Sequence, residues 1–253
     1  MLARQCRKLE DAALARPTLV VAPHPDDETL GCGGTIARIR AAGAPVIAVA
    51  CTDGSRSHPR LMPPAELRER RAAEFLAACQ RLGVEPPCVH LLGHADGSLA
   101  AHVDEAARTL ASLIAEHRIE RILVPFRGES VADHLAAREA GLRAREIGAQ
   151  RTEVLEYPIW FWNVWPFVQP EVHGVRSRWR AMVRARRARR LARDLDIAVE
   201  LGRHLQSKRD ALVCHRSQVT RLVDDPRWMT LADVAGGAWL ERCLGPAEYF
   251  ARA

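Results

Sequence analysis

The feature that most constrains the fold is an alternation of short apolar runs with alanine-rich runs across the first two-thirds of the chain. The apolar runs are rich in the aliphatic residues typical of strands and lie at residues 18–22, 45–51, 88–92, 121–125 and 153–157. Helices are predicted between them at residues 30–42, 64–83, 103–118 and 133–147. Strands that are apolar on both faces and alternate with helices predict an α/β fold with a mostly parallel sheet, covered on both sides.

The last third of the chain changes character without a linker that would separate it from the core. Residues 159–170 are dense in aromatic side chains, residues 176–193 hold nine arginines and no acid, and residues 206–218 are predicted to be helical. At 253 residues the chain has the size of one large α/β domain. We therefore expect residues 1–158 to form the core, and residues 159–253 to complete the same domain as a lid, a substrate-binding region or a membrane-facing region.

Composition excludes several classes of protein. With 48% hydrophobic and 27% charged residues, the chain is typical of globular proteins, and no apolar run approaches the roughly 20 residues of a membrane span. The N-terminus lacks the apolar stretch of a secretory signal, so we expect a cytoplasmic protein. The seven cysteines are scattered singly, which argues against both a disulfide framework and a cysteine-type zinc site.

A histidine and three acids, HPDDE at residues 24–28, directly follow the first predicted strand. Ligands of parallel α/β sheets gather at the carboxyl ends of the strands, where this loop would lie. His24 and Asp27 together suit a divalent cation, and Asp26 would then take a proton from a water whose pKa the cation lowers. The alternative is that these residues only cap the next helix, whose N-terminus favours negative charge.

A second histidine, His134, opens the helix predicted after the fourth strand, at the same edge of the sheet. His24, Asp27 and His134 would supply three protein ligands and leave one position open, as in catalytic rather than structural zinc sites. Asp133 is predicted to cap that helix. Taken alone, His134 would be an exposed histidine at a helix start, so the prediction depends on both loops.

Five segments in a fixed order extend this pattern: APHPDDETLGCGG, CTDGSRSHP, RRAAEFLAACQRLGV, LGHADGSL and DHLAAREA. With these segments the chain resembles the zinc-dependent de-N-acetylases that include the PIG-L and LmbE-like proteins and the mycothiol and bacillithiol deacetylases. The resemblance runs from about residue 18 to residue 157 and returns in KRDALVCHRSQ. It implies a Rossmann-like fold, one Zn²⁺ per chain, and removal of the N-acetyl group from an N-acetylglucosamine-type sugar in a glycan, glycolipid or glycoside.

The resemblance also implies roles for the matching residues. In the family pattern the zinc ligands fall on His24, Asp27 and His134. The general base falls on Asp26, and the sugar contacts fall on Arg71 and Asp96. Arg71 belongs to an R-x-x-E pattern with Glu74, ahead of Leu82 and Gly83. Asp133 completes the catalytic set as a partner that holds a metal ligand in orientation.

One position departs from the family pattern. The second motif commonly reads HPDH, whereas this chain has Val131 where the first histidine is expected. That histidine would stabilise the oxyanion or protonate the leaving amine, and loss of an oxyanion donor costs about 10²–10³ in rate. Arg127, four positions upstream, and His215, in the C-terminal motif, are the candidates to replace it at the substrate.

Three interpretations of the function remain open. The first is a deacetylase acting on a small-molecule or lipid-linked amino sugar. The second is a metal-binding relative with altered chemistry, an O-deacylase or another amidohydrolase, because of Val131. The third is a non-enzymatic protein that binds anionic surfaces through residues 176–193; nucleic acid is not an expected partner, because this basic cluster contains one aromatic residue and lies outside the α/β core.

The two unusual C-terminal segments are each open to two interpretations. The aromatic cluster is either a packed wall or a platform for a sugar ring or an apolar tail, and consists of Trp160, Phe161, Trp162, Trp165 and Phe167. Residues 176–193 are either a solvated helix face or a peripheral contact with the inner membrane face or a diphosphate-linked glycan. A homo-oligomer and the native metal stay open as well, since two histidines and one aspartate also suit iron or cobalt.

Overall fold

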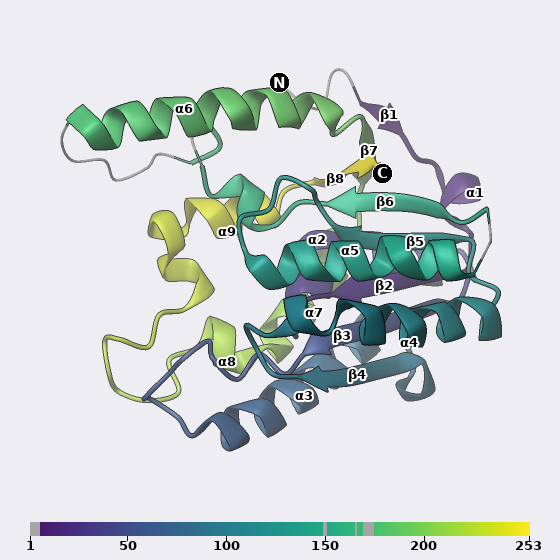
Figure 1. Ribbon diagram of the computed structural model, residues 1–253, viewed down its shortest axis with the longest axis horizontal. Helices are drawn as coiled ribbons and strands as arrows, with labels where there is room; N and C mark the ends of the chain where they lie inside the picture. Colours follow the sequence, from purple (N-terminus) through teal and green to yellow (C-terminus); the bar gives the residue numbers. More distant parts are fainter. Residues whose placement is uncertain (1–5, 149–150, 165, 169–174) are drawn as a thin grey trace.

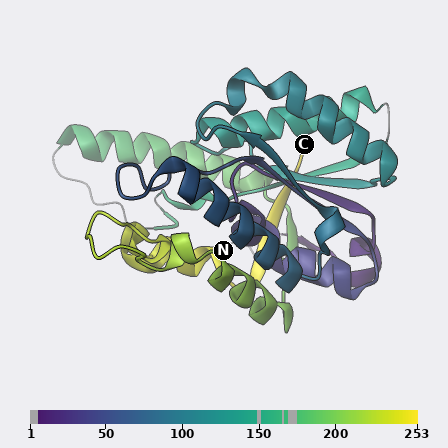
Figure 2. The same ribbon diagram turned by 90° about the horizontal axis from the view of Figure 1, so that it is seen from below.

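The structure, a computed structural model, describes residues 6–148, 151–164, 166–168 and 175–253, with the backbone alone for residues 175–181. Its centre is an eight-stranded sheet with helices on both faces (Figures 1 and 2). The strands are β1 (Arg7–Lys8), β2 (Thr18–Ala22), β3 (Val46–Thr52), β4 (Val89–His94), β5 (Arg121–Pro125), β6 (Glu153–Tyr157), β7 (Ile197–Glu200) and β8 (Ala247–Arg252). The predicted α/β fold with a mostly parallel sheet is confirmed, because β8 alone runs antiparallel to its neighbours within this sheet.

The five strands predicted from the sequence lie within two residues of their expected bounds. The α-helices of the described residues are α1 (Asp11–Leu14), α2 (Asp27–Ala41), α3 (Pro64–Arg81), α4 (Val103–Glu116), α5 (Ala132–Ile147), α6 (Val175–Leu191), α7 (His204–Cys214), α8 (Arg216–Val219) and α9 (Ala238–Cys243). Short 3₁₀ turns are η2 (Pro86–Cys88), η3 (Leu99–Ala101), η4 (Trp160–Trp162), η5 (Ala192–Asp194) and η6 (Leu231–Gly237). None of the described helices is both long and apolar enough to cross a bilayer.

Alternate residues of the central strands enter two separate cores, because successive side chains of a strand point to opposite faces. On β2, Val20 and Ala22 belong to the core that α2, α3 and α7 cover. Leu19 and Val21 belong to the core beneath α4 and α5. The central strands are therefore buried on both faces, which explains their continuous apolar character in the sequence.

The strand order places the two motif loops side by side. It reads β1-β7-β8-β6-β5-β2-β3-β4, so β2 lies between β3 and β5 and is parallel to both. The chain leaves β2 for β3 on one side, while β5 lies on the other, which makes this a topological switch point where α/β sheets bind ligands. The loops after β2 and β5, with the helix starts that follow them, consequently bring the two histidine motifs to one edge.

Two local predictions for helices are wrong. Asp133 does not cap α5, because the helix begins at Ala132 and the Asp133 carboxylate accepts hydrogen bonds from the backbone N–H groups of Gly97 and Leu99 in another loop. The helix predicted at residues 206–218 is divided at His215, which has ψ of 57° between α7 and α8. The first difference arises from the contact of Asp133 with a distant loop.

The glycines in the first turns of α2 allow close packing against the sheet. A Cβ atom at Gly31 would lie 2.2 Å from Cδ2 of Tyr157, whose hydroxyl donates a 2.7 Å hydrogen bond to the Val21 carbonyl. Farther along α2, the buried Glu248 carboxylate accepts from the backbone N–H groups of Gly34 and Thr35 at 2.9 and 2.7 Å. Helix α2 thus packs against β6 and is hydrogen-bonded to β8 at the far end of the chain.

We predict that Gly31→Ala lowers the free energy of unfolding by about 1–3 kcal/mol, because the added methyl group overlaps the buried Tyr157 ring. Urea unfolding followed by circular dichroism measures this change. Gly148→Ala is the matched control, since its Cβ would meet nothing closer than 3.5 Å. A Gly31→Ala protein as stable as the parent would contradict the packing described here.

Candidate active site

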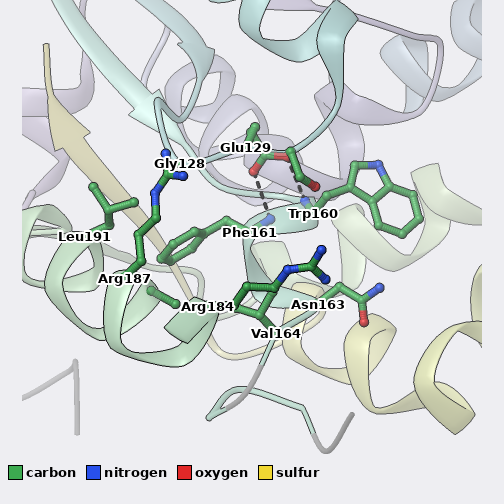
Figure 3. Close-up of a pocket in the computed structure, with 11 residues that line it drawn as sticks. Gly128, Glu129, Trp160, Phe161, Asn163, Val164, Arg184, Arg187 and Leu191 are labelled. Atoms are coloured by element: carbon green, nitrogen blue, oxygen red, sulfur yellow. Dashed lines mark hydrogen bonds between the residues drawn. The ribbon is translucent and has the colours of Figure 1, made fainter. Parts of the chain in front are cut away.

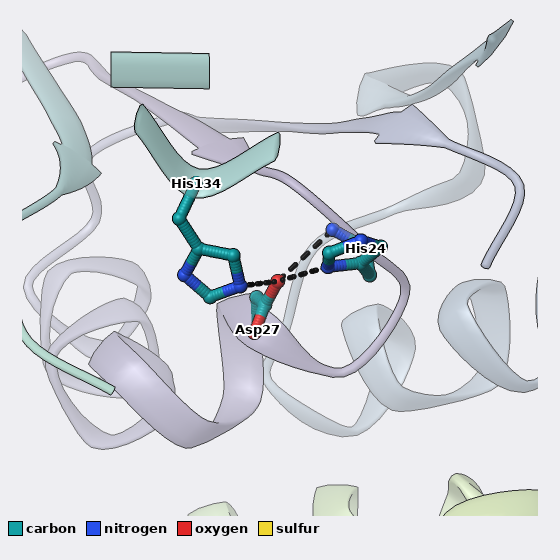
Figure 4. Close-up of side chains that lie close together, drawn as sticks. All are labelled: His24, Asp27 and His134. Carbon is teal, nitrogen blue, oxygen red and sulfur yellow. Dashed lines mark hydrogen bonds and ion pairs between the residues drawn. The ribbon is translucent and has the colours of Figure 1, made fainter. Parts of the chain in front are cut away.

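Three side chains, from the loop after β2 and from the first turns of α2 and α5, converge on one point (Figure 4). Asp27 Oδ2 lies 3.1 Å from Nδ1 of His24 and 3.3 Å from Nε2 of His134. One nitrogen or oxygen atom from each residue lies within 4.8 Å of the others. The arrangement gathers two imidazoles and one carboxylate, a donor set typical of Zn²⁺ sites with an open coordination position.

The electrostatics of this group fit a divalent cation. His134 is fully buried, and its Nε2 forms no well-aligned hydrogen bond although it faces Asp27. Burial alone would raise the pKa of Asp27, but the positive charge of the two histidines holds it well below its usual range. Burial would lower the pKa of His134, but the carboxylates of Asp27 and Glu129 raise it to about 9. A cation would replace these imidazole protons as the partner of Asp27.

Further carboxylates lie against the ring nitrogens of both histidines that do not face Asp27. Glu129 Oε2 lies 3.2 Å from Nδ1 of His134, the ring nitrogen that faces away from Asp27. On His24, Nε2 lies 3.4 Å from Oδ1 of Asp96 and 3.4 Å from Oδ2 of Asp133. Such partners fix the tautomer and the orientation of metal-binding histidines. Asp96, for which the resemblance implies a sugar contact, therefore lies against a candidate metal ligand.

Glu129 is a residue that sequence reasoning missed. Its carboxylate also accepts hydrogen bonds from the backbone N–H groups of Ile159, Trp160 and Phe161 at 2.8–3.1 Å. The available signal was its place three residues after Phe126, in the loop at the carboxyl end of β5. An acid beside an apolar strand end needs partners, but nothing in the sequence identifies them.

The neighbouring carboxylate, Asp26, has a different environment from Asp27. Burial raises the pKa of Asp26 to about 6, although the guanidinium of Arg71 opposes this. Arg71 lies 3.1 Å from Asp26 Oδ1 and also donates to the carbonyls of Pro25 and Gly54. Arg71 is 3% exposed, so its contacts are with the protein interior and with Asp26.

The backbone at Asp26 is strained. Its φ of 130° lies in a region that residues with a side chain rarely adopt, at a cost of about 1–3 kcal/mol. The N–H of Asp26 donates to Glu28 Oε2 at 3.0 Å, and Arg71 holds the preceding carbonyl. These bonds maintain a conformation that places neighbouring carboxylates in two separate environments.

His215 approaches the motif from the C-terminal third. Its Nε2 lies 2.8 Å from Glu28 Oε1 and 3.4 Å from the Thr29 hydroxyl oxygen, and the ring is fully buried. Burial would lower the pKa of His215, but the Glu28 carboxylate raises it. Glu28 thus connects His215 with the backbone N–H of Asp26.

Among the described residues, Arg127 has no contact with His24, Asp27 or His134. Its guanidinium pairs with Glu156 at 2.6 Å and with Asp194 at 3.0 Å. Glu74 of the R-x-x-E pattern accepts from the N–H and hydroxyl of Ser217 and so fastens the C-terminal motif to α3. Val131 is the residue before α5 and offers no polar side chain.

The aromatic segment is largely packed in the interior. Phe161 and Trp162 are each 4% exposed, Phe167 contacts both of them, and Trp160 stacks on Trp239 at 4.5 Å. This arrangement agrees with the interpretation of a packed wall for these residues. Trp165, which belongs to the same prediction, lies outside the described residues.

Taken together, the switch-point location, the two imidazoles with a carboxylate and the adjacent buried acid define an α/β protein with a candidate hydrolytic metal centre. The family model PIG-L, described as GlcNAc-PI de-N-acetylase, matches residues 19–145, half of the chain. The chain belongs to the PIG-L family of metal-dependent deacetylases, which are hydrolytic enzymes, and the predicted family is confirmed.

Relatives with assigned names and solved structures agree with this placement. The chain is 28% identical to 1D-myo-inositol 2-acetamido-2-deoxy-alpha-D-glucopyranoside deacetylase 2 of Catenulispora acidiphila, over 81% of this chain and 80% of that protein. It has the fold of N,N'-diacetylchitobiose deacetylase from Pyrococcus horikoshii, with a TM-score of 0.62, 21% identity, and coverage of 94% and 84%.

The same fold also occurs in GalB, the 4-carboxy-2-hydroxymuconate hydratase of Pseudomonas putida. The TM-score is 0.62 at 21% identity, with 94% of this chain and 96% of that chain covered. A hydratase and a deacetylase thus share the architecture, so the reaction has to be argued from the side chains of the site.

We predict that Arg71→Ala lowers the free energy of unfolding by about 3 kcal/mol or more, because Asp26 and two buried carbonyls lose their shared partner. Chemical denaturation measures the loss. Arg70→Ala is the neighbouring control, since Arg70 pairs with Glu66 at the surface and such pairs contribute about 0–1 kcal/mol. Equal effects of the two substitutions would show that the Asp26 contact contributes little.

Proposed function

We propose that the protein is a zinc-dependent hydrolase that removes the N-acetyl group from an N-acetylglucosamine-type sugar. The observation that carries the proposal is the convergence of His24, Asp27 and His134 directly beside the buried carboxylate of Asp26. The deacetylase names of relatives in the same family support this choice of reaction and of sugar.

His24, Asp27 and His134 would hold the zinc ion. When bound, zinc supplies the Lewis acidity that polarises the acetyl carbonyl group. Asp27 contributes negative charge to the site, while Glu129 behind His134, and Asp96 and Asp133 behind His24, keep both rings in their binding orientation.

Asp26 acts as general base in this proposal. Its carboxylate takes a proton from the attacking water and then delivers it to the departing amine, so that the sugar leaves with a free amino group and acetate is released. Arg71 fixes one oxygen of this carboxylate, and the strained backbone at Asp26 directs it. A base held in one position avoids the cost of reorganisation during the reaction.

Altered chemistry is the second candidate, because Val131 provides no hydrogen-bond donor where the family pattern has a histidine. His215 is buried beside Glu28, and Arg127 pairs with two acids. In the contacts described, neither His215 nor Arg127 therefore replaces that donor. An O-deacylase or another amidohydrolase with a different demand for protonation of the leaving group fits this difference.

The assignment of the metal ligands is tested by His24→Ala and His134→Ala. We expect one zinc ion per chain in the parent protein and less than a tenth of that occupancy in each variant after dialysis, measured by atomic emission. His117→Ala, at the end of α4, should keep full occupancy because that ring contacts Glu116 instead. A parent protein that never retains metal would contradict the proposal.

The role of Asp26 is tested by Asp26→Asn. Turnover should fall by about 10²–10⁴, because an amide of the same shape cannot accept the proton. Zinc occupancy should be unchanged, since Asp26 is not one of the three ligands. Parallel loss of zinc and activity would instead place Asp26 among the metal ligands.

Acetate release from neutral N-acetylglucosamine glycosides separates the two candidate reactions. We expect release of acetate together with a primary amine that fluorescamine detects. Hydrolysis of O-acetyl esters without any amine formation would favour the altered chemistry instead.

A further inference from the structure

A cavity of about 450 Å³ lies between the η4 turn and α6 (Figure 3). Its volume is in the range of small-molecule sites. The cavity is lined by Gly128, Glu129, Ser130, Trp160, Phe161, Asn163, Val164, Arg184, Arg187, Ala188 and Leu191. Apart from Glu129, which supports His134, none of these residues takes part in the proposed reaction.

The cavity is connected with the metal centre through Glu129. This side chain lines the cavity, and its carboxylate lies 3.2 Å from Nδ1 of His134. A molecule in the cavity is therefore separated from a candidate metal ligand by one side chain. A substrate that uses this cavity would place its acetamido group at the metal and another part against α6.

Two guanidinium groups dominate the charge of this cavity. Arg184 and Arg187 stand one turn apart on α6 and both line the cavity, since residues at i and i+3 share a helix face. Both are exposed, and neither forms an ion pair with an acid in the described part of the chain. Arg127 differs, because Glu156 and Asp194 occupy its guanidinium.

The acid in the cavity does not neutralise these arginines. Glu129 is 6% exposed, and its two oxygens accept from three backbone N–H groups and face His134. The remaining polar groups, the Ser130 hydroxyl and the Asn163 amide, are able to donate hydrogen bonds. The cavity therefore offers an excess of donors and of positive charge.

We propose that this cavity is a subsite for a phosphoryl group attached to the amino-sugar substrate, which Arg184 and Arg187 bind. A guanidinium suits phosphate oxygens because it presents a planar fork of donors. The Trp160 and Phe161 side chains provide apolar wall for the group that carries the phosphate. This proposal rests on the proposed deacetylase function and extends it to an anionic class of substrate.

Kinetics with two matched substrates test the subsite in the zinc-loaded enzyme. The probes are N-acetylglucosamine 1-phosphate and the neutral methyl N-acetylglucosaminide. Arg184→Ala and Arg187→Ala should each raise KM for the phosphate about tenfold, as expected for loss of a charge-assisted hydrogen bond at a partly exposed site. For the neutral substrate, kcat/KM should stay within twofold of the parent.

Arg186→Ala is the matched control, since Arg186 is exposed on the same helix but does not line the cavity. It should leave KM for both substrates unchanged. An equal effect of Arg186→Ala would overturn the proposal in favour of a diffuse charge effect. No difference between the two substrates in any variant would overturn it as well.

A binding measurement separates failure of the subsite from failure of the proposed function. Calorimetric titration of zinc-loaded Asp26→Asn with N-acetylglucosamine 1-phosphate requires no turnover. Binding that weakens about tenfold in Arg184→Ala and Arg187→Ala backgrounds supports the subsite even if no acetate release is found. Binding that these substitutions leave unchanged overturns it.

A third arm separates a soluble phosphate from a membrane surface. The parent protein and the three arginine variants are sedimented with phosphatidylglycerol vesicles at low salt. Vesicle binding that Arg184→Ala, Arg186→Ala and Arg187→Ala reduce alike, with no change in KM for the soluble phosphate, overturns the subsite in favour of a membrane-facing helix. Unchanged sedimentation with the expected KM changes supports the subsite.

Discussion

The structure depends on the neutralisation of several carboxylates that are buried at one edge of the sheet. Within the described residues, the acids around the site that are less than 8% exposed are Asp26, Asp27, Glu28, Glu74, Glu129 and Asp133. Buried charges are costly unless each has a partner. Arg71, the three histidines and a set of backbone N–H groups provide these partners. A divalent cation would add positive charge where Asp27 meets two imidazoles.

The C-terminal third supplies a large part of this compensation. Lys208 on α7 is 1% exposed, donates to the Leu30 carbonyl at 2.9 Å and pairs with Glu248 of β8 at 2.7 Å. Seven residues later, His215 pairs with Glu28. In the motif that returns near the C-terminus, Lys208 thus anchors α2. At its other end, His215 compensates the charge of Glu28.

Much of the fold was predictable because its signals are local. The central strands are apolar on both faces, and the helices between them have clear bounds, so the α/β sheet could be derived from the chain alone. The convergence of His24, Asp27 and His134 was also predictable, since parallel strands bring their following loops to one edge. The partners of Glu129 were not predictable, and neither was the contact between Glu28 and His215, which lie 187 positions apart. Side-chain contacts over such separations leave no periodic pattern in the sequence. The wrong cap at Asp133 has the same origin, as its carboxylate accepts from Gly97 and Leu99 in another loop.

The position of Glu129 makes two regions mechanically dependent on each other. One carboxylate orients the His134 ring and at the same time holds the backbone of η4, which forms a wall of the cavity. A displacement of the η4 backbone would therefore move the Glu129 carboxylate and alter the orientation of the His134 ring. A shift of that ring would in turn alter the position of η4. By thermodynamic linkage such an influence is reciprocal: a molecule that tightens the wall would strengthen the hold on the cation by the same factor as the cation strengthens the hold on that molecule.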